Sequence, residues 1–220
     1  LAVSDKKYFL SKLRGALVHC SFDNERPVIL NLVQTIDVLN FLNRVDLEVL
    51  ATSGVATPDH VIRTKAHPLL LELNDVKKNQ QGLIKLIESY ITKYEAYFRR
   101  YAKSSKVAKT MLSPLPKLIW ARGVGLIGVG ATLKDARVIT DLAQQNIKVM
   151  ADGIDAGGFH PVQEQDLFDM EYWSLEQAKI GKSSPPALQG QVVIVTGGAG
   201  VIGQAIACEF RASGAEIMLV

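Results

Sequence analysis

The chain has 220 residues, of which 48% are hydrophobic and 21% charged, and this composition is typical of a globular protein and excludes an intrinsically disordered one. Its 25 Lys and Arg residues against 22 Asp and Glu residues leave a formal charge of +3, an excess too small to indicate a nucleic-acid partner. No window of about 18 uninterrupted apolar residues exists, so we expect neither a membrane span nor a membrane partner.

Hydrophobic spacing predicts alternating helices and strands from the start of the chain. Apolar residues at helical intervals predict a helix over residues 5–20. A run rich in branched side chains predicts a buried strand over residues 27–33, and helical spacing returns over residues 35–43. These three elements already favour an α/β fold.

The next segment repeats this alternation. Residues 57–67 predict a short helix, which must end before Pro68 because proline disfavours helical geometry in the residue before it. Residues 69–73 are a short strand candidate. A long polar helix with a wide apolar stripe is expected over residues 76–104.

The middle of the chain predicts a hairpin followed by two helices. Residues 117–122 and 126–129 are expected to be strands that pair through a turn at residues 123–125. Capping-box chemistry opens a helix over residues 132–150, and a further helix is expected over residues 162–180.

A linker separates this region from a C-terminal segment with a strand-helix-strand pattern. Residues 181–186 are rich in Gly, Ser and Pro, as linkers are. Beyond them, an apolar strand over residues 191–195, a helix over 203–213 and a strand over 215–220 predict one βαβ unit.

The strongest chemical signal is the glycine-rich turn between the first strand and the helix of this unit. In such turns the first glycine permits a tight bend, the second lets the backbone approach a pyrophosphate, and the third lets the helix pack on the strand. Backbone N–H groups at the helix start then face the anion. The residues expected to bind a dinucleotide are Thr196, Gly197, Gly198, Gly200, Val201, Ile202 and Gly203.

The Thr-Gly opening of this turn resembles the short-chain dehydrogenase/reductase family. The usual pattern of that family, Thr-Gly-x-x-x-Gly-x-Gly, would place a glycine at Val201, and the observed spacing is closer to the Thr-Gly-x-x-Gly-x-x-Gly of its extended subgroup. The resemblance implies NAD or NADP as cofactor. The acidic ribose-binding residue and the catalytic Ser and Tyr-x-x-x-Lys would follow Val220, so we assign no catalytic residue and expect this chain to bind the cofactor weakly or not at all.

Two longer segments extend the resemblance to the whole chain. Residues 57–65 and 166–179, followed by the linker and Val-Thr-Gly-Gly, resemble bifunctional proteins that fuse a class II aldolase region, named rhamnulose-1-phosphate aldolase, to a short-chain dehydrogenase. The resemblance implies an aldolase-II-like α/β domain over residues 1–187 and the first βαβ unit of a Rossmann domain over residues 188–220. It also implies that the chain is the middle section of a longer protein, with a sugar or sugar-phosphate substrate.

The metal chemistry of class II aldolases has no counterpart in these residues. The segment 122–136 resembles the family's Asn-His-Gly segment, in which the histidine is a zinc ligand, but Val124 takes the place of that histidine. A catalytic zinc needs at least three protein ligands, and no such spacing occurs. We expect no zinc and a degenerate aldolase-like domain; a generic hairpin followed by a helix is the alternative.

A cationic segment is the other candidate site. It contains His60, Arg63, Lys65 and His67, and on one continuous helix the residues His60, Arg63 and His67 would share a face. Arginine forms paired hydrogen bonds with phosphates and carboxylates, so we predict a weak anion or substrate site. An ordinary solvated helix face is the alternative.

Three functions remain open. The chain is expected to be a catalytically incomplete part of a bifunctional sugar-phosphate aldolase and NAD(P)-dependent dehydrogenase. The second possibility is a non-catalytic binding or assembly module that forms a homo-oligomer. The third is an active aldolase, which would require a metal site. Two distant cysteines, Cys20 and Cys208, and a start without a signal peptide favour the cytoplasm.

Overall fold

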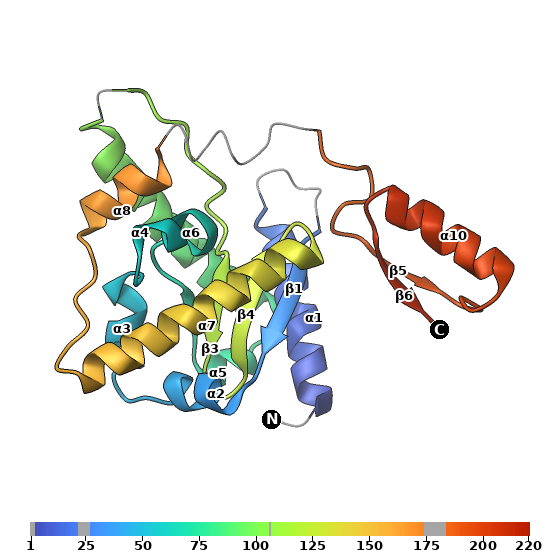
Figure 1. The fold of residues 1–220 in the computed structure, drawn as a ribbon, viewed down its shortest axis with the longest axis horizontal. Coiled ribbons are helices and arrows are strands. Elements are labelled where there is room, and N and C mark those ends of the chain that lie inside the picture. Colours follow the sequence, from blue (N-terminus) through green and yellow to red (C-terminus); the bar gives the residue numbers. More distant parts are fainter. Residues whose placement is uncertain (1–2, 22–26, 106, 174–183) are drawn as a thin grey trace.

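The computed structural model describes residues 3–21, 27–105, 107–173 and 184–220 (Figure 1). In chain order, its elements are α1 (Val3–His19), β1 (Ile29–Val33), α2 (Ile36–Leu42), α3 (Leu47–Ser53), α4 (Pro58–Thr64), β2 (Leu69–Leu71), α5 (Leu73–Val76), α6 (Gln80–Ala102), β3 (Leu118–Ala121), β4 (Gly125–Gly130), α7 (Leu133–Asp155), α8 (Glu164–Glu171), β5 (Val192–Val195), α10 (Val201–Ala212) and β6 (Glu216–Leu219). No helix of the described residues is long and apolar enough to cross a membrane.

A four-stranded mixed sheet forms the centre of the larger part of the chain. Its strand order is β1-β4-β3-β2, with β4 antiparallel to both neighbours and β2 parallel to β3. The side chains of a strand alternate between the two faces, and in β3 Ile119 packs on one face while Leu118 and Trp120 pack on the other. A sheet buried on both faces explains why its strands are almost entirely apolar, and Asn31 of β1, the one exception, donates a hydrogen bond to Thr140 Oγ1 of α7 at 2.8 Å.

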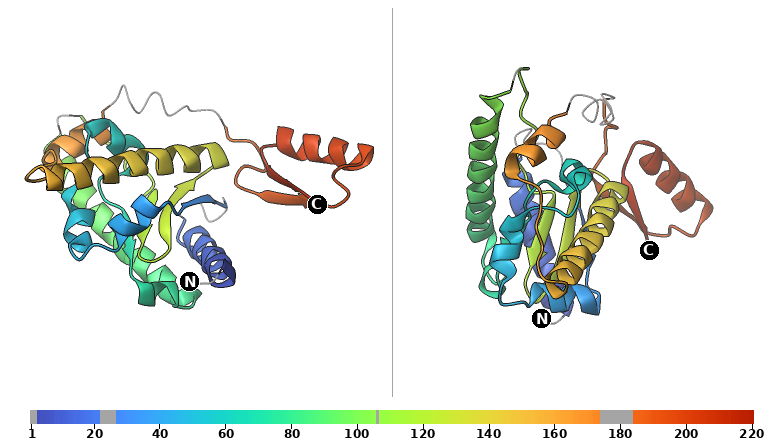
Figure 2. Two further views of the ribbon diagram at one scale, coloured as in Figure 1. Left: turned by 60° about the horizontal axis from the view of Figure 1, so that its bottom comes forward. Right: turned by 60° about the vertical axis from the view of Figure 1, so that its left-hand side comes forward.

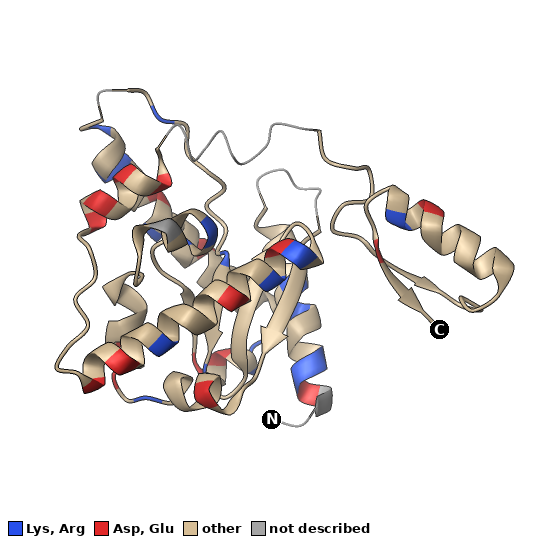
Figure 3. Cartoon of the chain, viewed as in Figure 1, with Lys and Arg blue, Asp and Glu red and all other residues tan. Residues whose placement is uncertain are grey.

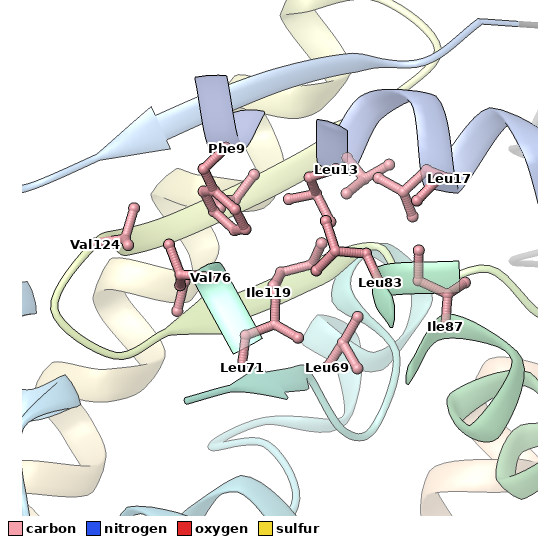
Figure 4. Packing of buried hydrophobic residues seen from close by; sticks show 14 of the residues in the cluster. Phe9, Leu13, Leu17, Leu69, Leu71, Val76, Leu83, Ile87, Ile119 and Val124 are labelled. Carbon is pink, nitrogen blue, oxygen red and sulfur yellow. The ribbon is translucent and has the colours of Figure 1, made fainter. Parts of the chain in front are cut away.

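Helices α1 and α6 cover one face of the sheet (Figure 2). The wide apolar stripe of α6 supplies Leu83 and Ile87, which meet Phe9, Leu13 and Leu17 of α1 (Figure 4). A fully buried side chain of this size stabilises the fold by about 1.5–3 kcal/mol. The core on this face is the largest hydrophobic cluster among the described residues.

The opposite face is covered by α7, together with α2 and α3. Phe41 of α2 meets Trp120 edge to face, with 5.4 Å between the ring centroids. Thr132 caps α7 by accepting a hydrogen bond from the backbone N–H of Asp135. Helices on both faces of one sheet make this part a three-layer α/β fold.

Residues 192–219 form a separate βαβ unit around the two-stranded parallel sheet β5-β6. Helix α10 packs against both strands. Arg14 donates a hydrogen bond from Nη2 to the carbonyl oxygen of Gly190, at 2.9 Å, and the N–H of Leu133 donates to Glu216 Oε1 at 2.8 Å. These contacts join the unit to the larger part.

Several expected elements differ from the observed ones in extent. The long helix begins at Gln80, because Asn79 caps it, and the four-residue helix α5 precedes it. Helix α3 was not predicted, and α7 continues five residues beyond its expected end. Within the helix expected over residues 162–180, the structure has α8 over Glu164–Glu171; residues 174–183, which include part of that expected helix and of the linker, lie outside the described residues.

Candidate functional site

A cavity of about 510 Å³ lies in the larger part of the chain. It is bordered by the segment between α4 and β2, by α3 and by one side of α6. Its volume falls in the range of small-molecule sites. The polar and aromatic residues that line it are Glu48, Thr52, Lys65, His67, Ser89, Tyr90, Lys93, Tyr94, Tyr97, Arg100 and Glu164.

Lys65 is held at the wall of this cavity by an unusual backbone. Helix α4 ends at Thr64, and Lys65 caps it with φ 64° and ψ 170°, a conformation found almost only in glycine. Its N–H donates a hydrogen bond to the carbonyl oxygen of Val61 at 2.9 Å. The turn directs the chain from α4 into β2 and places the lysine side chain in the interior, where only 5% of the residue is exposed.

The ammonium group of Lys65 lies near an aromatic ring, a backbone carbonyl group and two other charged side chains. Its Nζ lies 3.2 Å from the centre of the Tyr94 ring and donates a hydrogen bond to the carbonyl oxygen of Ser113 at 2.7 Å. Burial lowers the pKa of Lys65 to about 7; the negative charge of Glu171 opposes this shift, and the positive charge of Lys117 adds to it. At neutral pH a substantial fraction of this amine is therefore uncharged.

Glu171, at the end of α8, is the carboxyl group of the same cluster. It is 1% exposed and accepts hydrogen bonds from the hydroxyl groups of Tyr94, at 2.7 Å, and Tyr97, at 3.1 Å. Burial raises its pKa, and the charge of Lys65 opposes that shift. The hydroxyl of Tyr172 is 2.7 Å from that of Tyr94, so amine, carboxyl and phenol groups form one buried network.

A second group of charges lies at the edge of the cavity. Glu164 Oε2 accepts hydrogen bonds from Arg100 Nη1 at 2.8 Å and from the Tyr101 hydroxyl at 2.6 Å. His67 Nε2 is 3.9 Å from Glu164 Oε1. Burial lowers the pKa of His67 despite the nearby Glu164 charge, so this histidine is mostly neutral at pH 7.

The four predicted anion-site residues are only partly brought together. Lys65 and His67 line the cavity, whereas Arg63 is exposed and His60 is buried away from the cavity lining. The expected common helix face does not form, because the helix ends at Thr64 and the segment leading to Pro68 is not helical. Anion binding by these residues stays a prediction.

The glycine-rich turn has the backbone features that its sequence predicts. Gly197 has φ 67° and open space where a Cβ would lie, and Gly200 is the residue before the first turn of α10. A Cβ on Gly203 would collide with the carbonyl oxygen of Gly197, so this glycine lets α10 pack tightly against the turn. Val201 and Ile202 are largely exposed, and the helix start is accessible.

The described residues offer no metal centre. They contain no group of three or more His, Cys, Asp or Glu residues placed to hold an ion. Val124, at the position of the family's zinc-binding histidine, is fully buried and packs with the core under α1. This arrangement does not fit a catalytic zinc.

The sequence model of the family described as "Aldolase class II, second domain" matches residues 4–180. This chain belongs to that family. The matched residues contain all of the four-stranded sheet and its covering helices, and β5, α10 and β6 follow the match. The cavity and its buried network therefore belong to a class II aldolase second domain.

Two individual proteins are similar to the chain. "Uncharacterized oxidoreductase YuxG" of Bacillus subtilis (strain 168) is 31% identical over 212 residues, which are 94% of this chain and 30% of that protein. The chain thus spans less than a third of the length of that relative. The structure of an aldolase II superfamily protein from Pseudomonas syringae aligns with 94% of this chain and 64% of that chain, at 12% sequence identity. The TM-score of this alignment is 0.43, which is too low to support a statement about fold or function.

The sequence pointed to Lys65 but not to its partners. Tyr94, Tyr97 and Glu171 looked like ordinary members of amphipathic helices. They contact Lys65 or one another across more than 20 positions of the chain, because α8 packs against both α4 and α6. The one sequence signal for this network is the uneven distribution of tyrosines. Five of the six tyrosines lie in α6 or directly after α8.

Proposed function

We propose that the chain is the middle section of an NAD(P)-dependent oxidoreductase that also contains a class II aldolase region, and that it is catalytically incomplete by itself. One observation carries this proposal: the glycine turn of Gly197, Gly200 and Gly203 lies between a parallel strand and a helix start. The oxidoreductase name of the relative, and the small share of it that this chain spans, support the proposal.

In this proposal the chain supplies the phosphate-binding half of a dinucleotide site. Thr196, Gly197, Gly198 and Gly200 form the turn, in which the N–H of Gly200 donates to the carbonyl oxygen of Gly197 at 3.0 Å. Val201, Ile202 and Gly203 supply the backbone N–H groups of the first turn of α10. The nicotinamide group, when bound, would accept or donate a hydride. The residues that select NAD or NADP and that catalyse the transfer would come from the rest of the protein.

The exposed apolar residues of the βαβ unit support the presence of further protein around it. Val192 and Ile194 of β5 and Met218 of β6 are about half exposed, and apart from Glu216 the two strands carry no charge (Figure 3). Parallel strands are normally buried on both faces. Neighbouring strands and helices of a Rossmann domain would cover them.

The same observation favours one alternative, a binding or assembly module in which a second copy of the chain covers these residues. The two readings differ in oligomeric state. Gel filtration of the 220-residue chain at low micromolar concentration gives a monomer under the first proposal and a dimer or larger species under the second.

The experiment that tests the oxidoreductase proposal uses the protein made from the complete coding sequence. Titration with NADH and NADPH, followed by fluorescence, is expected to show saturable binding that weakens at least tenfold in the variant Gly203→Ala, about 1.4 kcal/mol. Ala205→Ser, at an exposed position of the same helix, is the matched control and is expected to bind as the wild type does. Equal binding by Gly203→Ala, or no binding by the wild type, would contradict the proposal.

The cavity is the proposed place for a sugar or sugar-phosphate substrate. Its lining combines cations, hydroxyl groups and apolar surface, which suits a small polar ligand. Class II aldolase chemistry through zinc is not part of the proposal, because Val124 and the described residues around it provide no ligand set.

A further inference from the structure

The backbone conformation and the burial of Lys65 both cost free energy, and these costs require a physical explanation. Among the described residues, Lys65 is the one non-glycine residue with a positive φ, and its conformation costs of the order of 1–3 kcal/mol. Burying its side chain adds a desolvation cost. Such costs persist in folds chiefly where the position has a function, and here the position is the wall of a cavity.

The surroundings of the amine are those of a nucleophile rather than of a simple ion pair. The ring of Tyr94 lies 3.2 Å from Nζ, and both residues line the cavity. The carboxyl group of Glu171 accepts hydrogen bonds from the hydroxyl groups of Tyr94 and Tyr97. Desolvation beside another cationic group, here Lys117, keeps part of the amine neutral and able to attack an electrophile.

We propose that Lys65 forms a Schiff base with the carbonyl group of a small hydroxylated aldehyde or ketone that binds in this cavity. The rim supplies side chains that can hydrogen-bond to hydroxyl groups, namely Glu48, Thr52, Ser89 and Glu164. Leu69, Leu70 and Leu86 supply the apolar part of the lining. The volume of about 510 Å³ accommodates a short sugar-like molecule. This inference does not depend on the dinucleotide turn.

The chemical step balances with the groups present. The lone pair of the neutral amine forms a C–N bond, the carbonyl π electrons move to oxygen, and one amine proton is transferred to that oxygen to give a carbinolamine. Glu171, in its protonated form, gives its proton to the departing hydroxyl group, which leaves as water. The Glu171 carboxylate then accepts the remaining N–H proton, and the product is a neutral imine. Tyr94 lines the cavity and its hydroxyl donates a hydrogen bond to Glu171, so this side chain provides a path for the proton.

Reductive trapping tests the proposal directly. The 220-residue chain is incubated at pH 7 with glyceraldehyde and cyanoborohydride, and labelled lysines are located by peptide mass spectrometry. The neutral fraction at pH 7 is about a thousandfold higher for an amine of pKa about 7 than for an ordinary lysine. We therefore expect Lys65 to be labelled at least tenfold faster than Lys93, which lines the same cavity.

Two variants separate chemistry from folding. Glu171→Gln keeps the size of the side chain and is expected to slow labelling at Lys65 without changing labelling at Lys93. Lys85→Met, at an exposed position of α6 outside the cavity lining, is the matched control and is expected to leave labelling of Lys65 unchanged. Labelling of Lys65 no faster than that of Lys93 in the folded wild type, as judged by circular dichroism, would overturn the proposal, as would an unchanged rate at Lys65 in Glu171→Gln.

Discussion

Burial and neighbouring charges together lower the pKa of Lys65, and this shift makes the stability of the folded chain depend on pH. The pKa of this lysine is about 7 in the folded chain, whereas the unfolded chain holds the proton up to the ordinary value of 10.5. Between these values the unfolded state binds more protons, so the folded state becomes more stable as the pH rises. Below pH 7, Lys65 is protonated in both states, and the full cost of burying its charge lowers the free energy of unfolding.

The corresponding prediction compares the wild type with Lys65→Met by urea unfolding from pH 7 to pH 9.5. The free energy of unfolding of the wild type is expected to rise relative to that of the variant by about 1 kcal/mol or more over this window, since one pKa unit corresponds to 1.4 kcal/mol. The window stops at pH 9.5 because tyrosines of the unfolded chain ionise above it. Parallel curves for the two proteins would contradict the predicted shift.

Arg122 makes a second prediction at the residue scale. Its Nε donates to Glu72 Oε2 at 2.7 Å, and its Nη1 donates to the carbonyl oxygens of Leu42, at 3.1 Å, and Arg44, at 2.9 Å. Replacement by Met leaves these acceptors without the arginine, so Arg122→Met is expected to lower the free energy of unfolding by about 1.5–3 kcal/mol. Arg99→Met, at an exposed position of α6, is the control and should change it by less than about 0.5 kcal/mol. Equal effects of the two substitutions would show that these bonds contribute nothing.

At the scale of elements, the pairing of α7 with β4 depends on glycines. A Cβ on Gly128 would meet the carbonyl oxygen of Ala136, and one on Gly130 would meet the backbone nitrogen of the same residue. The helix therefore lies close against the strand at these two positions. This close approach explains the glycines on both sides of Val129 in β4.

The prediction for this contact is a loss of about 2 kcal/mol or more in the free energy of unfolding of Gly128→Val, because overpacking displaces the helix backbone. Gly153→Ala, inside α7, would place the new Cβ 3.3 Å from the carbonyl oxygen of Gly158, a much milder contact; it is the control and should change stability by no more than about 1 kcal/mol. Thermal unfolding followed by circular dichroism measures both. A Gly128→Val protein as stable as the control would contradict the close approach.

The elements that the sequence predicted well are those defined by local signals. The hairpin of β3 and β4 pairs antiparallel through the expected glycine turn, and the capping of α7 by Thr132 follows from residues three positions apart. The end of α4 differs from the expected one because the turn at Lys65 depends on how the following segments pack. The start of α6 differs although its signal is local, since Asn79 accepts a hydrogen bond from the N–H of Gly82.

The candidate site was less predictable than the fold for the same reason. The charges of Lys65 and His67 identify them in the sequence, but Glu171 lies near Lys65, and Glu164 near His67, only because α8 packs against α4. Arg63 and His60 were grouped with them on the assumption of a continuous helix. Periodicity describes which face of one helix is apolar, and it contains no information about which distant helix will meet that face.

At the scale of the whole molecule, the chain combines a three-layer α/β part with a βαβ unit whose parallel sheet has only two strands. The class II aldolase second domain accounts for residues 4–180. The division into domains at residue 187, the Rossmann character of the unit and its nicotinamide cofactor stay predictions. They share one physical basis, the glycine turn at an accessible helix start.

The measurement that tests this account most directly is a fluorescence titration of the 220-residue chain with NADH, beside the protein made from the complete coding sequence. The account predicts that the chain binds NADH with a dissociation constant above about 10 μM, roughly 7 kcal/mol, because it supplies only the phosphate-binding half of the site. The longer protein is expected to bind NADH or NADPH at least tenfold more tightly. One-to-one binding of NADH by the chain alone below about 10 μM would contradict the account.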